Sequence, residues 1–511
     1  MVYLCLLKMN QATNSNGNGK GGQPIRQVKE NPESGPVSSS SDVKGSQVTF
    51  QTAEGLELHG APVRVTRHAA VFDLYNPNVV PRASEVLSGF EVVLHDRVVY
   101  SGRAVVSGIV DTGNTATCEV KLDESGWRDI DLGLLTKRDG QLAREFNDFL
   151  TEWQKFYRVR PEYKLILADM RSYFADLRLW VDQLELGIRS RPSGDRLKLE
   201  QEVALELGEV ALPSFTALFE KFEEAAQGVE EDFLPAHQAF AKGQLHPLLL
   251  CSPFFYRCYS KPLGYAGDYE MVNMMMRNPC EGGSLFAKVM NLWFLRQPPV
   301  QAHRNRIDYL AGQLLKVAMR AAGQGRKARI MSVGCGPAQE VQRFLAEQKL
   351  SAQAEFTLLD FNEETLQYVR STMDDARIQH RRSTPFHYVK KSVQTMLKES
   401  GRAVGLPARL QFDLVYCAGL FDYLSNQVCE RLTGILYDWV APGGLLIDTN
   451  VTSCNPSRGW MEHVVDWHLI YRDTRQMAAL IPKQSPPDKA RIVAEPTGVN
   501  IFLEVIKPEH A

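Results

Sequence analysis

The sequence predicts a multidomain protein in which a small antiparallel β-barrel, a helical bundle and an α/β domain with a parallel sheet follow one another. Three observations lead to this prediction. Short β-prone runs succeed one another over 47–132, apolar residues recur at helical spacing over 135–300, and from about Ala328 apolar strands alternate with amphipathic helices. The 511 residues also exceed one ordinary core, and at roughly 150 residues per domain they predict two to four domains.

The composition is that of an ordinary soluble protein, with 44% hydrophobic and 23% charged residues and a net charge of −2. Such a charge gives no overall attraction to nucleic acid or anionic membranes, so no nucleic-acid partner is expected. No apolar stretch approaches the ~20 residues of a membrane span. The nine cysteines are scattered without a C-x-x-C pair, which favours reduced thiols in a cytoplasmic protein and predicts no metal site.

Two different segments precede the helices. Residues 1–46 are rich in Asn, Gly, Ser, Gln and Pro, and are predicted to be disordered because they bury too little apolar surface to offset the entropy of ordering. Over 47–132, turn signals such as Glu54-Gly55 separate six β-prone runs, which predict a small barrel or sandwich. The runs cover 48–52, 62–66, 70–75, 90–94, 98–106 and 117–122.

This β-rich stretch resembles a PilZ-type barrel, a fold often fused to bacterial signalling proteins. The cyclic di-GMP signature of that family combines an R-x-x-x-R arm with a D/N-x-S-x-x-G strand motif. Here the nearest basic pair, Arg64 and Arg67, has the wrong spacing, and no such strand motif follows. The resemblance therefore implies the fold of the barrel without cyclic di-GMP binding.

Apolar residues at three- and four-residue steps predict that 135–300 is helical. A first stripe is followed, after Pro161, by a second pattern over 163–186. The Arg191-Pro192-Ser193-Gly194 group interrupts that pattern, and more helix follows to about Ala241. Core packing is the expected role of both stripes. The first stripe consists of Leu142, Phe146, Phe149, Trp153 and Phe156.

The α/β segment carries its chemistry at two strand ends. A β-rich run leads into Gly334-Cys335-Gly336 and then a helical run over 339–347, a turn whose glycines permit positive φ and close approach of a ligand. Asp360 ends the next strand, 24 residues after Gly336, where its carboxylate can accept both hydroxyls of a ribose. The alternative is that Asp360 caps the helix that begins at Asn362.

Further strands complete the pattern. Q-F-D-L-V-Y-C-A-G-L over 411–420 gives a fourth strand ending in small residues, and A-P-G-G-L-L-I over 441–447 opens a fifth. Residues 491–506, with a Pro-Thr-Gly turn at 496–498, form a terminal hairpin. The segment is thus expected to hold five parallel strands followed by a hairpin.

V-G-C-G-P, an acid ending the second strand, F-D-L-V and A-P-G-G occur in this order, and together they resemble class I S-adenosylmethionine-dependent methyltransferases over about 300–508. The resemblance implies a Rossmann-like seven-stranded sheet in 301–511, methyltransferase activity and S-adenosylmethionine as cofactor. A nicotinamide-binding domain is the rival, but its G-x-G-x-x-G/A pattern requires Gly or Ala where Gln339 stands. Ala338 replaces a third glycine of the family and is small enough to fit.

Carried over position by position, the resemblance assigns residues to each part of the cofactor. Arg304 or Arg306 could also pair with the cofactor's carboxylate through the guanidinium fork, the alternative being a solvated charge at a helix start. The assigned residues are Gly334, Cys335 and Gly336 for the methionine part, Asp360 for the ribose, Phe361, Ser392 and Val393 for the adenine, and Cys417, Ala418 and Gly419 for the sulfonium end.

A second resemblance rests on K-P-L-G-Y-A-G-D-Y-E-M-V-N at 261–273, H-R-N-R at 303–306, N-P-S-R at 455–458 and D-W-H-L-I-Y-R at 466–472. Over about 140–508 the chain looks like bacterial methyltransferases assigned to making 3-hydroxy fatty acid methyl ester signals of quorum sensing, such as 3-hydroxypalmitate methyl ester. The implied partner is a small-molecule substrate, a fatty acid in an apolar tunnel, whose carboxylate is ionised at pH 7 and needs no general base. Arg458 or Arg472 is expected to orient this carboxylate, with Tyr265 or His468 as hydrogen-bond donors.

Other functions stay open at this point. The acceptor could be a protein, an RNA or another small molecule, although Ala418-Gly419-Leu420-Phe421 stands where base N-methyltransferases carry an N-P-P-Y-type motif. The chain could also be a regulatory binding protein that uses the barrel as a sensor. For His468, packing beside Trp467 is the alternative to catalysis.

Overall fold

The computed structural model describes residues 46–74, 80–94, 97–111, 116–128, 159–191, 193–400 and 411–509. Of the segment predicted to be disordered, only Ser46 is among them, and the predicted stripe from Leu142 to Phe156 lies outside the described residues. No helix in these ranges combines the length and the apolar character that crossing a bilayer requires.

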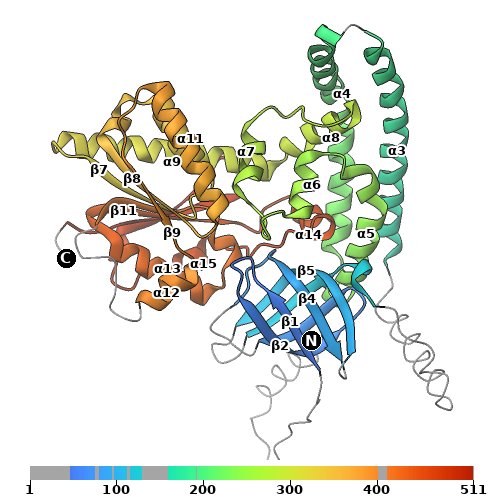
Figure 1. The fold of residues 1–511 in the computed structure, drawn as a ribbon, viewed down its shortest axis with the longest axis horizontal. Coiled ribbons are helices and arrows are strands. Elements are labelled where there is room, and N and C mark those ends of the chain that lie inside the picture. The colour runs from blue at the N-terminus through green and yellow to red at the C-terminus, as the bar shows by residue number, and fades with distance from the viewer. Residues whose placement is uncertain are drawn as a thin grey trace, which may run out of the picture. The chain divides into compact units, whose positions relative to one another are not determined.

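The first described stretches form a closed antiparallel barrel with the strand order β1-β2-β3-β6-β5-β4 (Figure 1). Phe50, Phe72 and Phe90 are buried in it, with ring centroids 5.4–6.0 Å apart. Closure removes exposed strand edges, and the predicted barrel is confirmed. The strands are β1 (Gln47–Gln51), β2 (Glu57–Val65), β3 (Ala69–Leu74), β4 (Val86–Leu94), β5 (Arg97–Asp111) and β6 (Ala116–Leu122).

A helical region follows, as predicted. Pro161 is the first residue of α3, where its missing N–H leaves no helical bond unmade. The helices share one core, in which the rings of Phe219 and Trp293 stack at 4.1 Å. They are α3 (Pro161–Arg189), α4 (Ser193–Gln227), α5 (Leu234–Leu249), α6 (Pro253–Ser260), α7 (Tyr269–Met276) and α8 (Leu285–Leu295).

The C-terminal part is built on a seven-stranded sheet in the order β12-β13-β11-β10-β7-β8-β9. Strands β7 to β11 pair in parallel, and β13 runs antiparallel to both β11 and β12. This is the predicted arrangement of five parallel strands and a hairpin. The strands are β7 (Ala328–Val333), β8 (Ala354–Asp360), β9 (Phe386–Lys390), β10 (Phe412–Cys417), β11 (Val440–Val451), β12 (Ala490–Ala494) and β13 (Asn500–Ile506).

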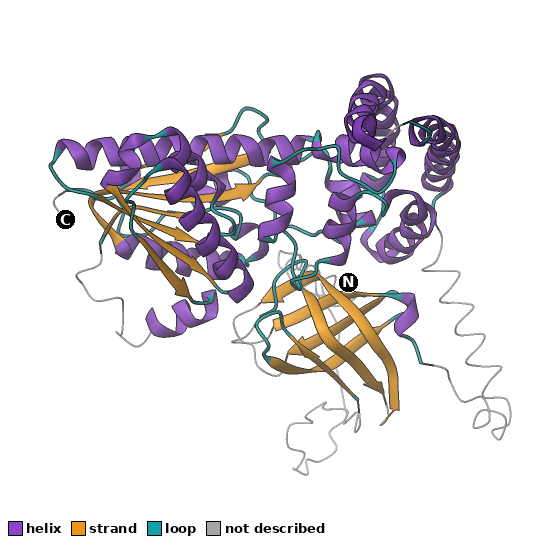
Figure 2. Ribbon diagram, turned by 45° about the horizontal axis from the view of Figure 1, so that its top comes forward, coloured by secondary structure: helices purple, strands orange, loops and turns teal. Residues whose placement is uncertain are grey.

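Helices cover both faces of this sheet and bury a separate core on each (Figure 2). Because β7 lies between β8 and β10, the chain order reverses beside it. Open α/β sheets bind their ligands at the carboxyl ends of the strands around such a switch point. The helices are α9 (Pro298–Gly323), α10 (Gln339–Glu347), α11 (Glu363–His380), α12 (Val393–Ser400), α13 (Asn426–Trp439) and α15 (Thr474–Ala478), whereas α14 (Arg458–Val464) packs against α4 and α5.

Candidate functional site

A large cavity opens at the carboxyl ends of β7 and β8, beside the switch point. Its empty volume is about 1720 Å³, the solvent at its mouth included. Both the glycine turn after β7 and Asp360 at the end of β8 line it. The walls continue along α7, α9, the end of β10 and the segment after β11, and they include Arg82 and Ala83 of the barrel. The two strand ends predicted to bind a ligand therefore face one space.

Left-handed backbone shapes the turn after β7. Gly334 and Gly336 have φ of 64° and 50°, a region in which a Cβ causes strain. Ala338 also takes a φ of 49°, directly before α10 begins at Gln339. Its side chain is buried and fits, as expected from its size. Its backbone nevertheless carries strain that a glycine would avoid.

Asp360 connects the two strand ends. Its carboxylate accepts hydrogen bonds from the backbone N–H of Gly336 at 3.2 Å and of Asn362 at 3.0 Å. Burial raises the pKa of Asp360, and these N–H groups oppose the shift. The capping role considered for Asp360 belongs to Asn362, whose side chain accepts from Thr365 N at 3.0 Å. Asp360 therefore keeps lone pairs for a ligand in the cavity.

Aromatic rings form the end of the cavity beyond Asp360. The ring of Phe361 lies 5.1 Å from that of Tyr265, and the Arg82 guanidinium lies over it at 4.2 Å. Val393 continues this wall, whereas Ser392 accepts from Thr395 N at 3.3 Å and lies outside the lining. Tyr265, predicted to donate a hydrogen bond to an acceptor, lies at this end of the cavity beside Phe361.

A buried arginine lies in the middle of the cavity. Arg306 donates to His303 Nδ1 at 2.8 Å, and it approaches so closely that a Cβ on Gly419 would lie 2.9 Å from its Nη1. Burial lowers the pKa of Arg306 and holds that of His303 well below its ordinary value. Glu340 and Asp422 face the guanidinium, but no carboxylate of the described residues lies within 4.0 Å of it. An anionic group of a ligand would complete this site.

Arg304, two residues earlier on α9, has a different role. Its guanidinium donates to the carbonyl oxygens of Met275 at 2.8 Å and Leu295 at 3.0 Å. These bonds tie the ends of α7 and α8 to α9. Residues two apart on a helix point in different directions, so only Arg306 of the two candidate arginines lines the cavity.

The opposite end of the cavity is an apolar chamber. The hydroxyl of Tyr423 accepts from Trp467 Nε1 at 3.1 Å. Trp460 Nε1 and Asn500 Oδ1 are buried and have no hydrogen-bond partner within the described part of the chain. Unpaired buried polar atoms are costly, so a ligand that pairs with them is favoured. The apolar side chains are Phe254, Met271, Met275, Trp460, Met461, Trp467 and Leu469.

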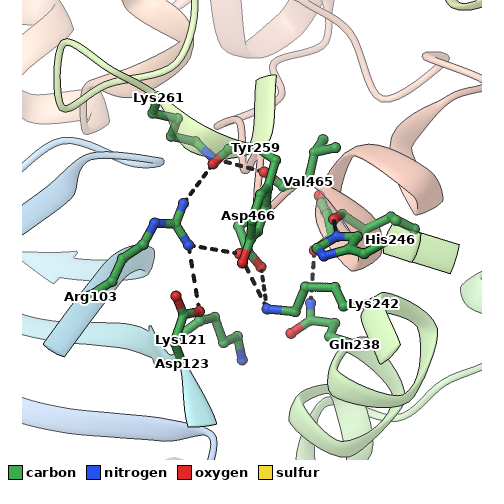
Figure 3. A network of polar contacts seen from close by, with 12 residues as sticks. Arg103, Lys121, Asp123, Gln238, Lys242, His246, Tyr259, Lys261, Val465 and Asp466 are labelled. Atoms are coloured by element: carbon green, nitrogen blue, oxygen red, sulfur yellow. Dashed lines mark hydrogen bonds and ion pairs between the residues drawn. The ribbon is translucent and has the colours of Figure 1, made fainter. Parts of the chain in front are cut away.

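An ionic cluster surrounds Asp466, the residue before the chamber residue Trp467 (Figure 3). Asp466 pairs with Lys242 at 3.1 Å and with Arg103 of the barrel at 3.6 Å. Lys261 donates to the carbonyl oxygen of Val465, the residue before Asp466, at 2.7 Å. Burial alone would raise the pKa of Asp466, but the three cations outweigh burial and hold it well below its ordinary value. The cluster joins the barrel, the helices and the segment after β11.

Three residues predicted to act on the acceptor lie outside the cavity lining. Arg472 is buried and donates to Asn450 Oδ1 at 2.6 Å and to two backbone carbonyls. Arg458 pairs with Glu462 at 2.8 Å. His468 is buried, and burial lowers its pKa to about 3. The two arginines are engaged by the protein itself, so the geometry does not support their predicted role in orienting an acceptor.

Most residues assigned to the cofactor line the cavity, while Arg304, Ser392 and Cys417 do not. The Cys417 side chain is buried in one of the two cores that flank the sheet, where burial raises its pKa well above the ordinary value. The structure adds residues that sequence reasoning missed, and the barrel residues among them carried no motif that could have revealed them. The predicted residues that line the cavity are Gly334, Cys335, Gly336, Asp360, Phe361, Val393, Ala418, Gly419 and Tyr265, and the added ones include Arg82, Ala83, His303, Asp422, Tyr423 and Asn500.

No family model matches the sequence, and no curated protein matches it. Among solved structures, a possible exported protein from Bordetella parapertussis is 16% identical, with a TM-score of 0.38, over 59% of this chain and 97% of that one. Magnesium protoporphyrin IX methyltransferase ChlM from Synechocystis PCC 6803, with bound SAM, is 11% identical, with a TM-score of 0.28, over 41% and 81%. The N-methyltransferase NodS from Bradyrhizobium japonicum WM9 is 14% identical, with a TM-score of 0.28, over 47% and 98%. Matches this distant carry no weight for function.

Proposed function

We propose that the chain is an S-adenosylmethionine-dependent methyltransferase whose acceptor is the carboxylate of a 3-hydroxy fatty acid, converted to a methyl ester signal. The observation that carries the proposal is the cavity, which runs from the glycine turn and Asp360, past Arg306, to the apolar chamber. The part around Asp360 and Phe361 is called the donor end from here on, and the chamber is called the acceptor end.

The donor end fits the cofactor part by part. Asp360 would accept from the ribose hydroxyls, and Phe361 with Val393 would enclose the adenine. Arg306 would pair with the carboxylate of the methionine part, and the acids Glu340 and Asp422, which face the same guanidinium, suit its ammonium group. A zwitterionic tail thus supplies the anion that the buried Arg306 lacks among the described residues.

S-adenosylmethionine brings an activated methyl group and its own leaving group, so the protein's contribution is positioning and exclusion of water. An ionised carboxylate attacks without losing a proton, and no general base is needed. The histidine of the cavity, His303, is not arranged as such a base, because its pKa is lowered by burial and its Nδ1 already accepts a hydrogen bond from Arg306. The chemistry therefore needs no residue of the cavity to take up a proton.

The acceptor end suits an acyl chain. Met271 and Met275 are flexible apolar side chains that adapt to acyl chains of different shape. Trp460 and Tyr423 line the chamber, and their Nε1 and hydroxyl groups would donate to the carboxylate. Asn500 Oδ1 would accept from the 3-hydroxyl. Neutral donors orient a carboxylate without neutralising the charge that makes it a nucleophile.

The test uses the full-length protein with labelled S-adenosylmethionine. The panel contains 3-hydroxy fatty acids of several chain lengths, each matched with the fatty acid that lacks the hydroxyl, together with protein and RNA acceptors. Labelled methyl esters are expected from the hydroxy acids, with less from their matched controls. Transfer to another acceptor and none to the acids would refute the fatty acid. Failure to bind the cofactor would refute the methyltransferase as well.

A further inference from the structure

One short segment of the barrel lines the cavity and contacts residues around it. Segment 80–86 leads into β4, which begins at Val86, and its Arg82 and Ala83 line the cavity. Ala83 N donates to the carbonyl oxygen of Tyr423 at 3.4 Å, and Val86 N donates to that of Gly264 at 2.6 Å. These contacts reach the acceptor end, the donor end and the turn before α7, so the barrel forms part of the site wall.

The segment is braced for this role. Ser84 has a φ of 60°, a strained conformation for a residue with a side chain. Its hydroxyl donates to the carbonyl oxygen of His468 at 2.8 Å and accepts from the N–H of the same residue at 2.5 Å. Buried Glu85 accepts from Ala53 N at 2.6 Å and from Arg82 N at 2.7 Å. The residues after Arg82 therefore hold it in two ways. Ser84 ties the segment to His468, and Glu85 ties it to Ala53 within the barrel.

Arg82 itself is held from two sides. Its guanidinium lies 4.2 Å from the centroid of the Phe361 ring and pairs with Glu54, and only 13% of its side chain is exposed. A cation over an aromatic face is attracted by the ring quadrupole, more strongly when both are removed from water. The contact fixes the ring that follows Asp360 in the chain.

We infer that Arg82 is a positioning residue of the donor end, which holds the Phe361 ring in the orientation that encloses the adenine. This inference rests on the proposed function. Without Arg82, the Phe361 ring loses the cation over its face and keeps its contact with Tyr265. Cofactor affinity is expected to fall, while the methyl-transfer step at saturating cofactor changes little, because Arg82 acts at the adenine and not at the reacting atoms.

The experiment compares three full-length variants with the wild type. Arg82→Ala removes the cation, Arg82→Lys keeps a cation on a thinner side chain, and Arg103→Ala is the matched control. Arg103 is also a barrel arginine over an aromatic ring, Tyr259 at 4.7 Å, but lies outside the cavity lining. Lys242 and Lys261 remain beside Asp466 in that control, so the barrel keeps part of its docking.

Titration calorimetry with S-adenosylhomocysteine gives the dissociation constant, and steady-state kinetics separate KM for the cofactor from kcat. Arg82→Ala is expected to raise both the dissociation constant and KM about tenfold with kcat within about twofold. Arg82→Lys should recover part of the loss, and Arg103→Ala should bind within about twofold of the wild type. Wild-type affinity in Arg82→Ala, or an equal loss in Arg103→Ala, overturns the inference. A wild type that does not bind S-adenosylhomocysteine overturns the proposed function itself.

Discussion

The two ends of the cavity are built in different ways. The donor end comes from neighbouring strand ends of one sheet, with the glycine turn after β7 and Asp360 after β8 in contact through Gly336. The acceptor end is assembled from α6, α7, the segment after β11 and the barrel, which are distant in sequence. The donor end thus rests mainly on one sheet, to which the barrel adds Arg82, whereas the acceptor chamber depends throughout on how separate parts of the chain pack together.

This contrast predicts that damage to the packing between the parts disturbs the acceptor end more than the donor end. The largest effect is expected from Asp466→Asn. The substitution leaves Arg103, Lys242 and Lys261 without their buried carboxylate, and breaking such a pair costs about 3–5 kcal/mol. Urea unfolding measures the loss of stability, and calorimetry with S-adenosylhomocysteine on the folded variant should show a smaller loss of affinity than Arg82→Ala does. A loss of cofactor affinity as large as that of Arg82→Ala would contradict this contrast between the two ends.

The same carboxylate predicts a pH dependence. Because its folded pKa lies below the ordinary value of 3.8, Asp466 stabilises the fold above about pH 4, and this contribution is lost as the pH falls through the folded pKa. The difference in unfolding free energy between wild type and Asp466→Asn should therefore shrink as the pH falls below 4. Urea unfolding of the two proteins at a series of acidic pH values and equal ionic strength measures this difference.

At the donor end, Asp360→Ala is expected to weaken S-adenosylhomocysteine binding about 10- to 100-fold, since hydrogen bonds to a charged group contribute about 1.5–3 kcal/mol. Calorimetry measures the affinity, and an unchanged circular dichroism spectrum serves as the folding control. The KM for the acceptor should stay within about threefold of the wild type. Unaltered cofactor affinity would remove the ribose role of Asp360.

At the acceptor end, Trp460→Phe deletes the unpaired Nε1 donor and keeps most of the apolar surface. The loss of one hydrogen bond to a carboxylate is expected to raise KM for the acceptor about tenfold, with the cofactor dissociation constant unchanged. Kinetics with a 3-hydroxy fatty acid and calorimetry with S-adenosylhomocysteine give the two numbers. An equal effect on both ligands would show that the ends are coupled.

The smallest expected effect is a change in stability at the turn after β7. Ala338→Gly relieves a left-handed residue and is expected to stabilise the protein by about 1 kcal/mol, because strain of this size exceeds the entropy that glycine adds to the unfolded chain. Ala338→Val, which keeps the conformation and adds a β-branched side chain, is the matched opposite. A rise in thermal midpoint for the glycine variant and a fall for the valine variant would confirm the strain.

The same contrast explains how far the sequence could lead. The donor end could be predicted because a glycine turn and the acid 24 residues later are placed by the sheet that their own segment forms. The choice between Arg304 and Arg306 needed the helix orientation, which the charges alone do not give. Arg472 follows the fifth strand, and this position suggested that it binds a ligand. Its guanidinium instead donates hydrogen bonds to Asn450 and to two backbone carbonyl oxygens. Arg82 could not be anticipated, because only the docking of the barrel brings it to Phe361.

The hydrogen bonds between Ser84 and His468 span 384 residues of chain. A ribosome adds about 5–20 residues per second, so roughly 20–80 s separate the synthesis of the two partners. During that interval the nascent barrel can already be folded, while segment 80–86 stays exposed to solvent because His468 has not yet been synthesised. A chain terminated before residue 468 carries the glycine turn and Asp360 and still lacks the residue to which Ser84 binds.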